Sequence, residues 1–233
     1  MKNITLRTPV HKKKSAQSLS ALRVPDLVRL LRDRISTHTI APATPLREAA
    51  LAQEFFVSRA YVRDALSSLE ERRLVERIPN VGARVVKIDL ELAIKIYETR
   101  EALESQSVRL ATINSKPGNW KSFQTKFHQA RQLFQANGSV EEYLCAINDF
   151  RQRCTELADN PVLLDFQEMM LDRTRMIIRR VAILPGRPAQ GLAEHAALVT
   201  AMDAGDAEKA AQLARENIRS ALQFLIRYKD FVF

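Results

Sequence analysis

The sequence is poor in the residues that stabilise secreted proteins or hold a chain in a membrane. Cys145 and Cys154 are its only cysteines, and they form neither a CxxC motif nor a disulfide framework, as is usual in a reducing cytosol. Residues 1–20 contain no apolar core for a signal peptide, and no hydrophobic run is long enough to cross a bilayer. We therefore expect a cytoplasmic protein that does not associate with a membrane.

Patterns of common catalytic sites are missing as well. The sequence contains no nucleophile–base motif, no phosphate-binding glycine loop and no clustered metal ligands, so we expect neither enzymatic activity nor a cofactor. With 46% hydrophobic and 27% charged residues among 233, the composition is that of a globular protein with one large domain or two small ones.

Positive charge is concentrated at one end of the chain. Residues 1–88 carry 17 Lys and Arg against 8 Asp and Glu, whereas the remainder carries 19 of each. The whole net charge of +9 therefore belongs to the first part. Such an asymmetry indicates a polyanionic partner for that part, and we expect double-stranded DNA.

Apolar periodicity in this basic part predicts three helices, at Val24–Ile35, Leu46–Phe55 and Ser58–Arg72. Two alternating segments at 74–78 and 83–86 flank a Pro-Asn-Val-Gly turn and predict a β-hairpin. Three helices followed by a hairpin is the pattern of a winged helix-turn-helix, whose third helix enters the major groove of DNA.

The third predicted helix has an unusual exposed face. Ser58 is a suitable N-cap, but Arg59 and Arg63 follow one turn apart, where they oppose the helix dipole and repel each other. An external phosphate or guanine edge would reverse that balance. The alternative is a solvated surface on which the two arginines pair with nearby acids, namely Glu48, Glu54 or Asp64.

Several motifs here resemble the DNA-binding domain of GntR-family transcriptional regulators. The motifs are Leu46-Arg47-Glu48, Leu51-Ala52, Val57-Ser58-Arg59, Val62-Arg63-Asp64-Ala65-Leu66, Leu69-Glu70, Leu74-Val75 and Pro79-Asn80-x-Gly82. The resemblance implies phosphate and base contacts from the third helix and a wing that reaches the minor groove. The DNA-contacting residues we predict are Arg47, Ser58, Arg59, Tyr61, Arg63, Asn80, Gly82 and Arg84.

The sequence departs from the family pattern at four positions. Ala43, Phe56 and Arg73 replace turn glycines, and each costs about 1 kcal/mol if its turn requires a positive φ. Ala49 replaces an arginine of the second helix, and Arg47, two positions away on that helix, points elsewhere and cannot substitute for it.

The second part is predicted to be almost wholly helical, with roughly six helices in an antiparallel bundle that leaves room for a central cavity. The expected fold class is therefore mostly α: a winged helix-turn-helix followed by an all-α bundle. We expect a basic tail at 1–20, the DNA-binding domain at 21–87 and an effector-binding and dimerisation domain at 88–233.

This part resembles the ligand-binding domain of the FadR subfamily of GntR regulators, the FCD type. The residues that carry the resemblance are Tyr97-Glu98-x-Arg100-x-x-Leu103-Glu104, Phe150, Asn160-Pro161, Glu194-His195 and Gly205-Asp206-Ala207-Glu208-x-Ala210. Many members hold a divalent metal with one Asp and three His. The positions that match those ligands hold Ile147, Arg151, His195 and Asn217 here, so we predict no metal.

Arg151 at a ligand position suits a different anchor. An inward guanidinium is a fixed cation that matches a carboxylate, and we predict an effector site for a small organic acid formed by Arg100, Ile147, Arg151, His195 and Asn217. The alternative is a structural ion pair between Arg151 and Glu104 or Glu194.

Together these features predict a transcriptional regulator, in keeping with the family a repressor, that binds a roughly palindromic operator as a homodimer and responds to an acidic metabolite. Two alternatives remain: a DNA-binding scaffold without an effector, and a metabolite-converting enzyme that is tethered to DNA by its basic part.

Overall fold

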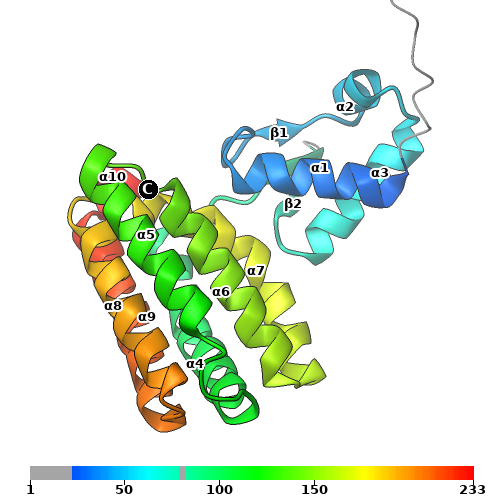
Figure 1. Cartoon of the computed structure of the whole chain (residues 1–233). Coiled ribbons are helices and arrows are strands. Elements are labelled where there is room, and N and C mark those ends of the chain that lie inside the picture. Colours follow the sequence, from blue (N-terminus) through cyan, green and yellow to red (C-terminus); the bar gives the residue numbers. More distant parts are fainter. Residues whose placement is uncertain (1–22, 79–81) are drawn as a thin grey trace, which may run out of the picture.

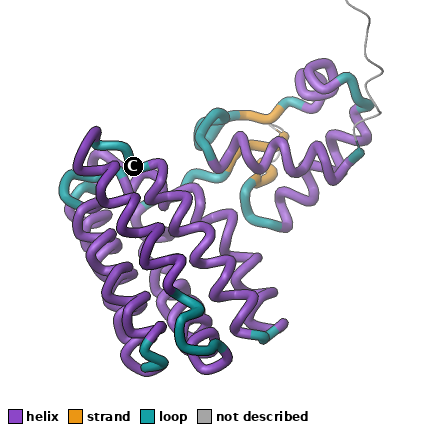
Figure 2. The backbone as a smooth tube through the Cα atoms, viewed as in Figure 1, coloured by secondary structure: helices purple, strands orange, loops and turns teal. Residues whose placement is uncertain are grey.

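The structure, a computed structural model, describes residues 23–78 and 82–233. Asn80 lies outside the described residues. The described chain forms a small α/β unit followed by a helical bundle (Figure 1), and its strands are confined to the first unit (Figure 2). The predicted mostly-α fold, with a winged helix-turn-helix before an all-helical part, is confirmed.

The first unit contains three helices, α1 (Val24–Ser36), α2 (Glu48–Phe55) and α3 (Arg59–Glu71). Their facing sides supply a core that includes Leu27, Leu31, Leu66 and Leu69, all nearly inaccessible to solvent. Ser58 caps α3, because its Oγ accepts a hydrogen bond from the Tyr61 N–H at 3.2 Å. The three helices and this cap agree with the sequence prediction.

The sheet has one strand more than the predicted hairpin. Its strands β1 (Pro45–Leu46), β2 (Val75–Ile78) and β3 (Gly82–Val85) lie in the antiparallel order β1-β3-β2. The chain before α2 pairs with β3 through a hydrogen bond from the Ala43 N–H to the Val85 carbonyl at 3.0 Å. Arg47 is therefore an extended N-cap residue with ψ of 118°. The prediction that it belongs to the second helix was wrong.

Three turns of this unit are strained. Ala43, Phe56 and Arg73, the residues that replace family glycines, have φ values of 61°, 53° and 59°. This is the left-handed region, which a side chain with a Cβ enters at a cost of about 1–2 kcal/mol. The turns do require a positive φ, as the sequence comparison with the family anticipated.

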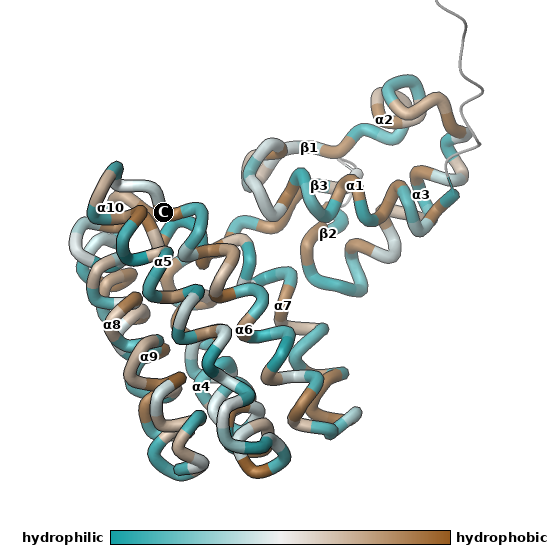
Figure 3. The backbone as a smooth tube through the Cα atoms, viewed as in Figure 1, coloured by the Kyte–Doolittle hydropathy of each residue, from teal (hydrophilic) through white to brown (hydrophobic). Residues whose placement is uncertain are grey.

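The bundle is built around α4 (Leu90–Asn114), the central helix seen behind the others in Figure 1. The remaining helices are α5 (Lys121–Asn137), α6 (Glu141–Ala158), α7 (Pro161–Ala182), α8 (Arg187–Asp203), α9 (Ala207–Arg227) and the short α10 (Lys229–Val232). Polar and apolar residues alternate along them (Figure 3), as expected for amphipathic helices that bury one face. No helix of the described part has an apolar stretch long enough to cross a membrane.

Two hydrophobic clusters hold the molecule together. One lies inside the bundle around Trp120, Phe127 and Phe150. The other is continuous from the core of the first unit to the adjoining end of the bundle, and its members include Leu31, Met176 and Ile177. The two units are therefore packed against each other through apolar contacts as well as joined by the chain.

Candidate DNA-binding surface and effector cavity

The N-terminal end of α3 presents a polar surface. Val62, Ala65 and Leu66 face inward, so the residues between them turn outward at helical spacing. Ser58, Arg59 and Tyr61 are all exposed. This end of α3 is thus free to contact an external partner.

The two arginines of this helix differ in their surroundings. Arg63 donates from Nε and Nη2 to the two carboxylate oxygens of Glu48 on α2, at 3.3 and 3.1 Å. Its hydrogen bonds lower the pKa of the Glu48 carboxyl. Arg59 takes part in no ion pair within 23–78 and 82–233. The pairing alternative raised by the sequence therefore holds for Arg63 and not for Arg59.

The remaining predicted DNA contacts flank this helix. Arg47 is exposed just before α2, and Gly82 opens β3 with φ of 101°, a conformation that favours glycine. Arg84 lies opposite Glu76 in the hairpin register, and its Nε donates to Glu76 at 2.6 Å. Half-exposed surface pairs of this kind are weak, about 0–1 kcal/mol, so an external phosphate can compete for Arg84.

The bundle contains a partly open cavity of about 690 Å³, lined from α4, α6, α7, α8 and α9. Four of the five predicted effector residues line it, namely Arg100, Arg151, His195 and Asn217. Ile147, the fifth, is buried in the aromatic cluster and is not a lining residue. Position 147 of α6, which the sequence analysis assigned to the effector site, therefore holds a core side chain.

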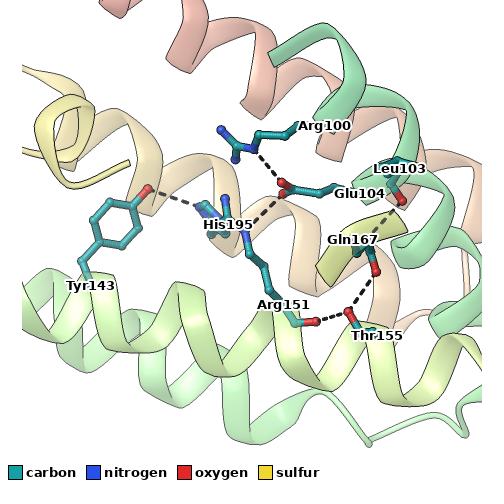
Figure 4. Close-up of polar contacts among 8 residues, drawn as sticks. All are labelled: Arg100, Leu103, Glu104, Tyr143, Arg151, Thr155, Gln167 and His195. Carbon is teal, nitrogen blue, oxygen red and sulfur yellow. Dashed lines mark hydrogen bonds and ion pairs between the residues drawn. The ribbon is translucent and has the colours of Figure 1, made fainter. Parts of the chain in front are cut away.

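Glu104 on α4 is the centre of the polar contacts in the cavity (Figure 4). Its two carboxylate oxygens accept hydrogen bonds from Arg100 Nε at 2.7 Å and from Arg151 Nε at 3.1 Å. Burial alone would raise the pKa of Glu104, but the two guanidinium charges lower it to about 2. The cluster thus contains two cations and one anion.

That cluster leaves donors without partners. The Nη1 atoms of Arg100 and Arg151 and the hydroxyl of Ser107 are buried and make no hydrogen bond within the part of the chain that the structure describes, and all three side chains line the cavity. Buried polar groups in native proteins are almost always paired. An anion with oxygen acceptors would satisfy these donors. Ser107 was missed by the sequence analysis, since a lone serine on a helix carries no signal.

His195 is buried beside this cluster. Its Nδ1–H donates to the Gly191 carbonyl at 2.8 Å, and its ring stacks on Phe127 with centroids 4.9 Å apart. Burial lowers its pKa to about 4, so the ring is neutral at physiological pH. Nε2 then remains an acceptor on a ring held in place by packing.

Asn217 belongs to a second polar group. Its Nδ2 donates to Glu194 at 2.7 Å, and Arg187 Nη1 donates to the same carboxylate oxygen at 2.7 Å. Within the described ranges no three His, Cys, Asp or Glu side chains come together as a metal site would require. The cavity wall also carries the carboxylates of Glu156, Asp159 and Glu168, so the part of it that suits an anionic organic ligand is the group of donors on Arg100, Arg151 and Ser107.

Comparison with known proteins agrees with this architecture. Residues 25–85 match the model of the bacterial regulatory proteins of the gntR family, and residues 95–220 match the FCD domain. The HTH-type transcriptional repressor RspR of Escherichia coli is 29% identical over 152 residues, which cover 64% of this chain and 66% of that protein. The repressor GlaR of the same organism is 24% identical over 208 residues, 86% of this chain and 94% of GlaR.

Among solved structures, E. coli McbR/YncC superimposes with a TM-score of 0.71 at 21% identity, covering 88% of this chain and 98% of that one. The likeness supports the fold. The FCD match alone spans more than half of the sequence, and the helix-turn-helix match covers most of what precedes it. The chain therefore belongs to the GntR family of bacterial regulatory proteins, with an FCD domain after its winged helix-turn-helix.

Proposed function

We propose that this protein is a transcriptional repressor that binds double-stranded DNA through the N-terminal end of α3. The observation that carries the proposal is the exposed guanidinium of Arg59, which forms no ion pair among the described residues, at the start of a helix, where the dipole disfavours a cation. The excess positive charge of residues 1–88 and the family's repressors support it. The protein would act in the cytoplasm, where the chromosome is.

The proposed DNA contacts are those of α3 and its flanks. Arg59 and Arg63 would contact bases or phosphates, Ser58 and Tyr61 the backbone, and Arg47 the adjacent phosphates. The wing, with Asn80, Gly82 and Arg84, would lie along the neighbouring groove. The division at residues 21–87 and 88–233 then separates DNA recognition from effector binding and dimerisation.

We propose further that the repressor is a homodimer on a roughly palindromic operator. An apolar stripe on the outer face of α7 supports this: Val162, Phe166 and Met169 are 63%, 53% and 62% exposed. A two-fold axis that passes near Phe166 would bring the stripes of two copies of α7 together and bury them.

The effector would be a small organic acid bound in the cavity. Its carboxylate would accept hydrogen bonds from the free Nη1 atoms of Arg100 and Arg151 and from Ser107. The cluster has one more cation than anion, so an acid would neutralise it. Without an effector, the protein would be a DNA-binding scaffold. The pairing of both arginines with Glu104 favours that alternative, because Glu104 already neutralises half of the charge.

The test begins with selection of operator DNA from random duplexes by the full-length protein. Arg59→Ala should weaken operator binding by about 1–3 kcal/mol. Arg29→Ala, which removes an exposed arginine from α1, is the matched control and should bind normally. Equal binding by wild type and both variants would refute the role of α3. For the cavity, thermal shift against a panel of carboxylic acids should find a stabilising ligand that Arg151→Ala no longer binds.

A further inference from the structure

Asp172 of α7 is the most deeply buried carboxylate of the described chain, with its side chain 3% exposed. Both cations that neutralise it come from the DNA-binding unit. Arg72 Nη1 donates to Asp172 Oδ2 at 3.3 Å, and Arg32 Nε lies 3.7 Å from Oδ1. A buried acid in the bundle thus depends on the other unit for its counter-charges.

The two arginines are placed to control orientation. Arg32 is on α1, and Arg72 is the C-cap residue of α3. Arg72 therefore lies at the end of α3 opposite Arg59, about one helix length of 20 Å away. A contact at this end fixes the direction of the helix without occupying its DNA-facing end.

A second polar contact joins the DNA-binding unit to α7, one turn beyond Asp172. The Nε2–H of His38, just after α1, donates to the Met176 carbonyl at 2.8 Å. His38 adopts φ of 58°, a strained conformation for a residue with a Cβ. Burial lowers its pKa, so the ring is neutral near pH 7 and the contact is a hydrogen bond between neutral groups.

The same stretch of α7 also lines the cavity. Met170, Leu171, Thr174 and Arg175, which flank Asp172 in sequence, are all lining residues. One helix therefore carries the cavity wall on one side and the contact to the recognition helix on the other. Because a helix moves as a rigid body over two turns, a shift of the wall displaces Asp172 as well.

We infer that Asp172, with Arg72 and Arg32, is an interdomain latch through which α7 sets the orientation of the recognition helix. The inference rests on the proposed function and adds the route by which the cavity controls DNA binding. In a dimer, once one recognition helix has bound its half-site, a correctly oriented second helix meets the other half-site at a high effective concentration. A loosened latch leaves each helix intact but lowers that concentration.

The latch can be tested first without DNA. In the full-length protein, Asp172→Asn and Arg72→Gln should each speed amide hydrogen exchange at the C-terminal end of α3 by about tenfold, because the domain undocks more often. Asp149→Asn removes an exposed acid paired with Lys126 on the bundle surface and is the matched control. If one variant fails to fold, the other still decides. Wild-type exchange in a folded variant overturns the latch.

The second measurement uses the selected operator and the same duplex with one half-site replaced. Both latch variants should lose about tenfold in affinity for the full operator and keep wild-type affinity for the single half-site. Equal losses on both duplexes, or no loss on either, overturn the latch. If wild type and Asp149→Asn select no specific DNA, the proposed function fails instead, and the exchange rates still show whether the latch exists.

Discussion

The arginines of the recognition helix and those of the cavity illustrate two ways of holding positive charge. Arg59 and Arg63 are exposed, and the ion pair that Arg63 forms with Glu48 lies on the surface. Arg100 and Arg151 share one carboxylate inside the bundle, and the Arg100 side chain is only 5% exposed. Water stabilises the first pair of arginines, whereas the second depends on Glu104. Removing Glu104 should therefore destabilise the fold, whereas removing Glu48 should leave the fold stable and strengthen DNA binding.

The largest effect is expected at Glu104. Glu104→Gln leaves two buried guanidiniums facing each other without an anion, and should lower the free energy of unfolding by about 3–5 kcal/mol. The measurement is urea denaturation at pH 7.5. Glu141→Gln is the control, since Glu141 accepts two hydrogen bonds from Arg179 at the surface, and its loss should cost less than about 1 kcal/mol. Equal losses would remove the distinction between buried and exposed pairs.

The buried ring of His195 should make the free energy of unfolding fall in acid. Its folded pKa of about 4 lies below the value of 6.5 for an exposed histidine, so the unfolded chain binds the proton more tightly. The contribution of the neutral ring to the free energy of unfolding is fully present above pH 6.5 and is lost as the pH falls toward 4. Between pH 7.5 and pH 5 this loss amounts to about 2 kcal/mol.

Urea denaturation at the two pH values checks this prediction. His195→Gln should have a smaller drop in stability, by about 2 kcal/mol, than the wild type. His128→Gln, which changes an exposed histidine of α5, should retain the wild-type drop. A drop in His195→Gln as large as that of the wild type would mean that other groups cause it.

Local patterns in the sequence predicted most of the first unit. The spacing of Val62, Ala65 and Leu66 marks the buried face of α3, and Ser58 marks its start, because caps and periodicity depend on near neighbours. The three strained turns were anticipated from the replaced glycines. The strand β1 was missed, since its two residues, which pair with positions 39 and 37 residues further along the chain, have no periodicity of their own.

Side-chain partners were harder to predict than helices. Four of the five effector residues predicted from the resemblance to the FadR subfamily line the cavity, but the sequence could not choose between Glu104 and Glu194 as the partner of Arg151. It gave no reason to expect Asp172 to pair with Arg72, 100 residues earlier. Such pairs depend on how helices cross, which is fixed by tertiary packing. The Glu48–Arg63 pair was one of three alternatives for the same reason.

In the DNA-binding unit, backbone strain should affect stability more than charge does. Phe56 is 85% exposed and has φ of 53°, so Phe56→Gly relieves the strain and loses almost no packing. We expect a gain of about 1 kcal/mol in the free energy of unfolding. Ala204→Gly is the control, because Ala204 ends α8 with φ of −75° and a glycine there should destabilise. A loss of stability in Phe56→Gly would show that the side chain has a packing role.

The smallest effect is expected at Glu48. Its removal should strengthen operator binding, whereas removal of Glu104 should weaken the fold. Glu48 occupies the Nε and Nη2 groups of Arg63, so Glu48→Gln removes a competitor for the proposed DNA contact and should strengthen operator binding by about 0.5 kcal/mol, with little change in stability. The gain should vanish in the Arg63→Ala background, which a double-mutant cycle on the operator measures. A gain that persists without Arg63 would mean that Glu48 acts by repelling phosphate directly.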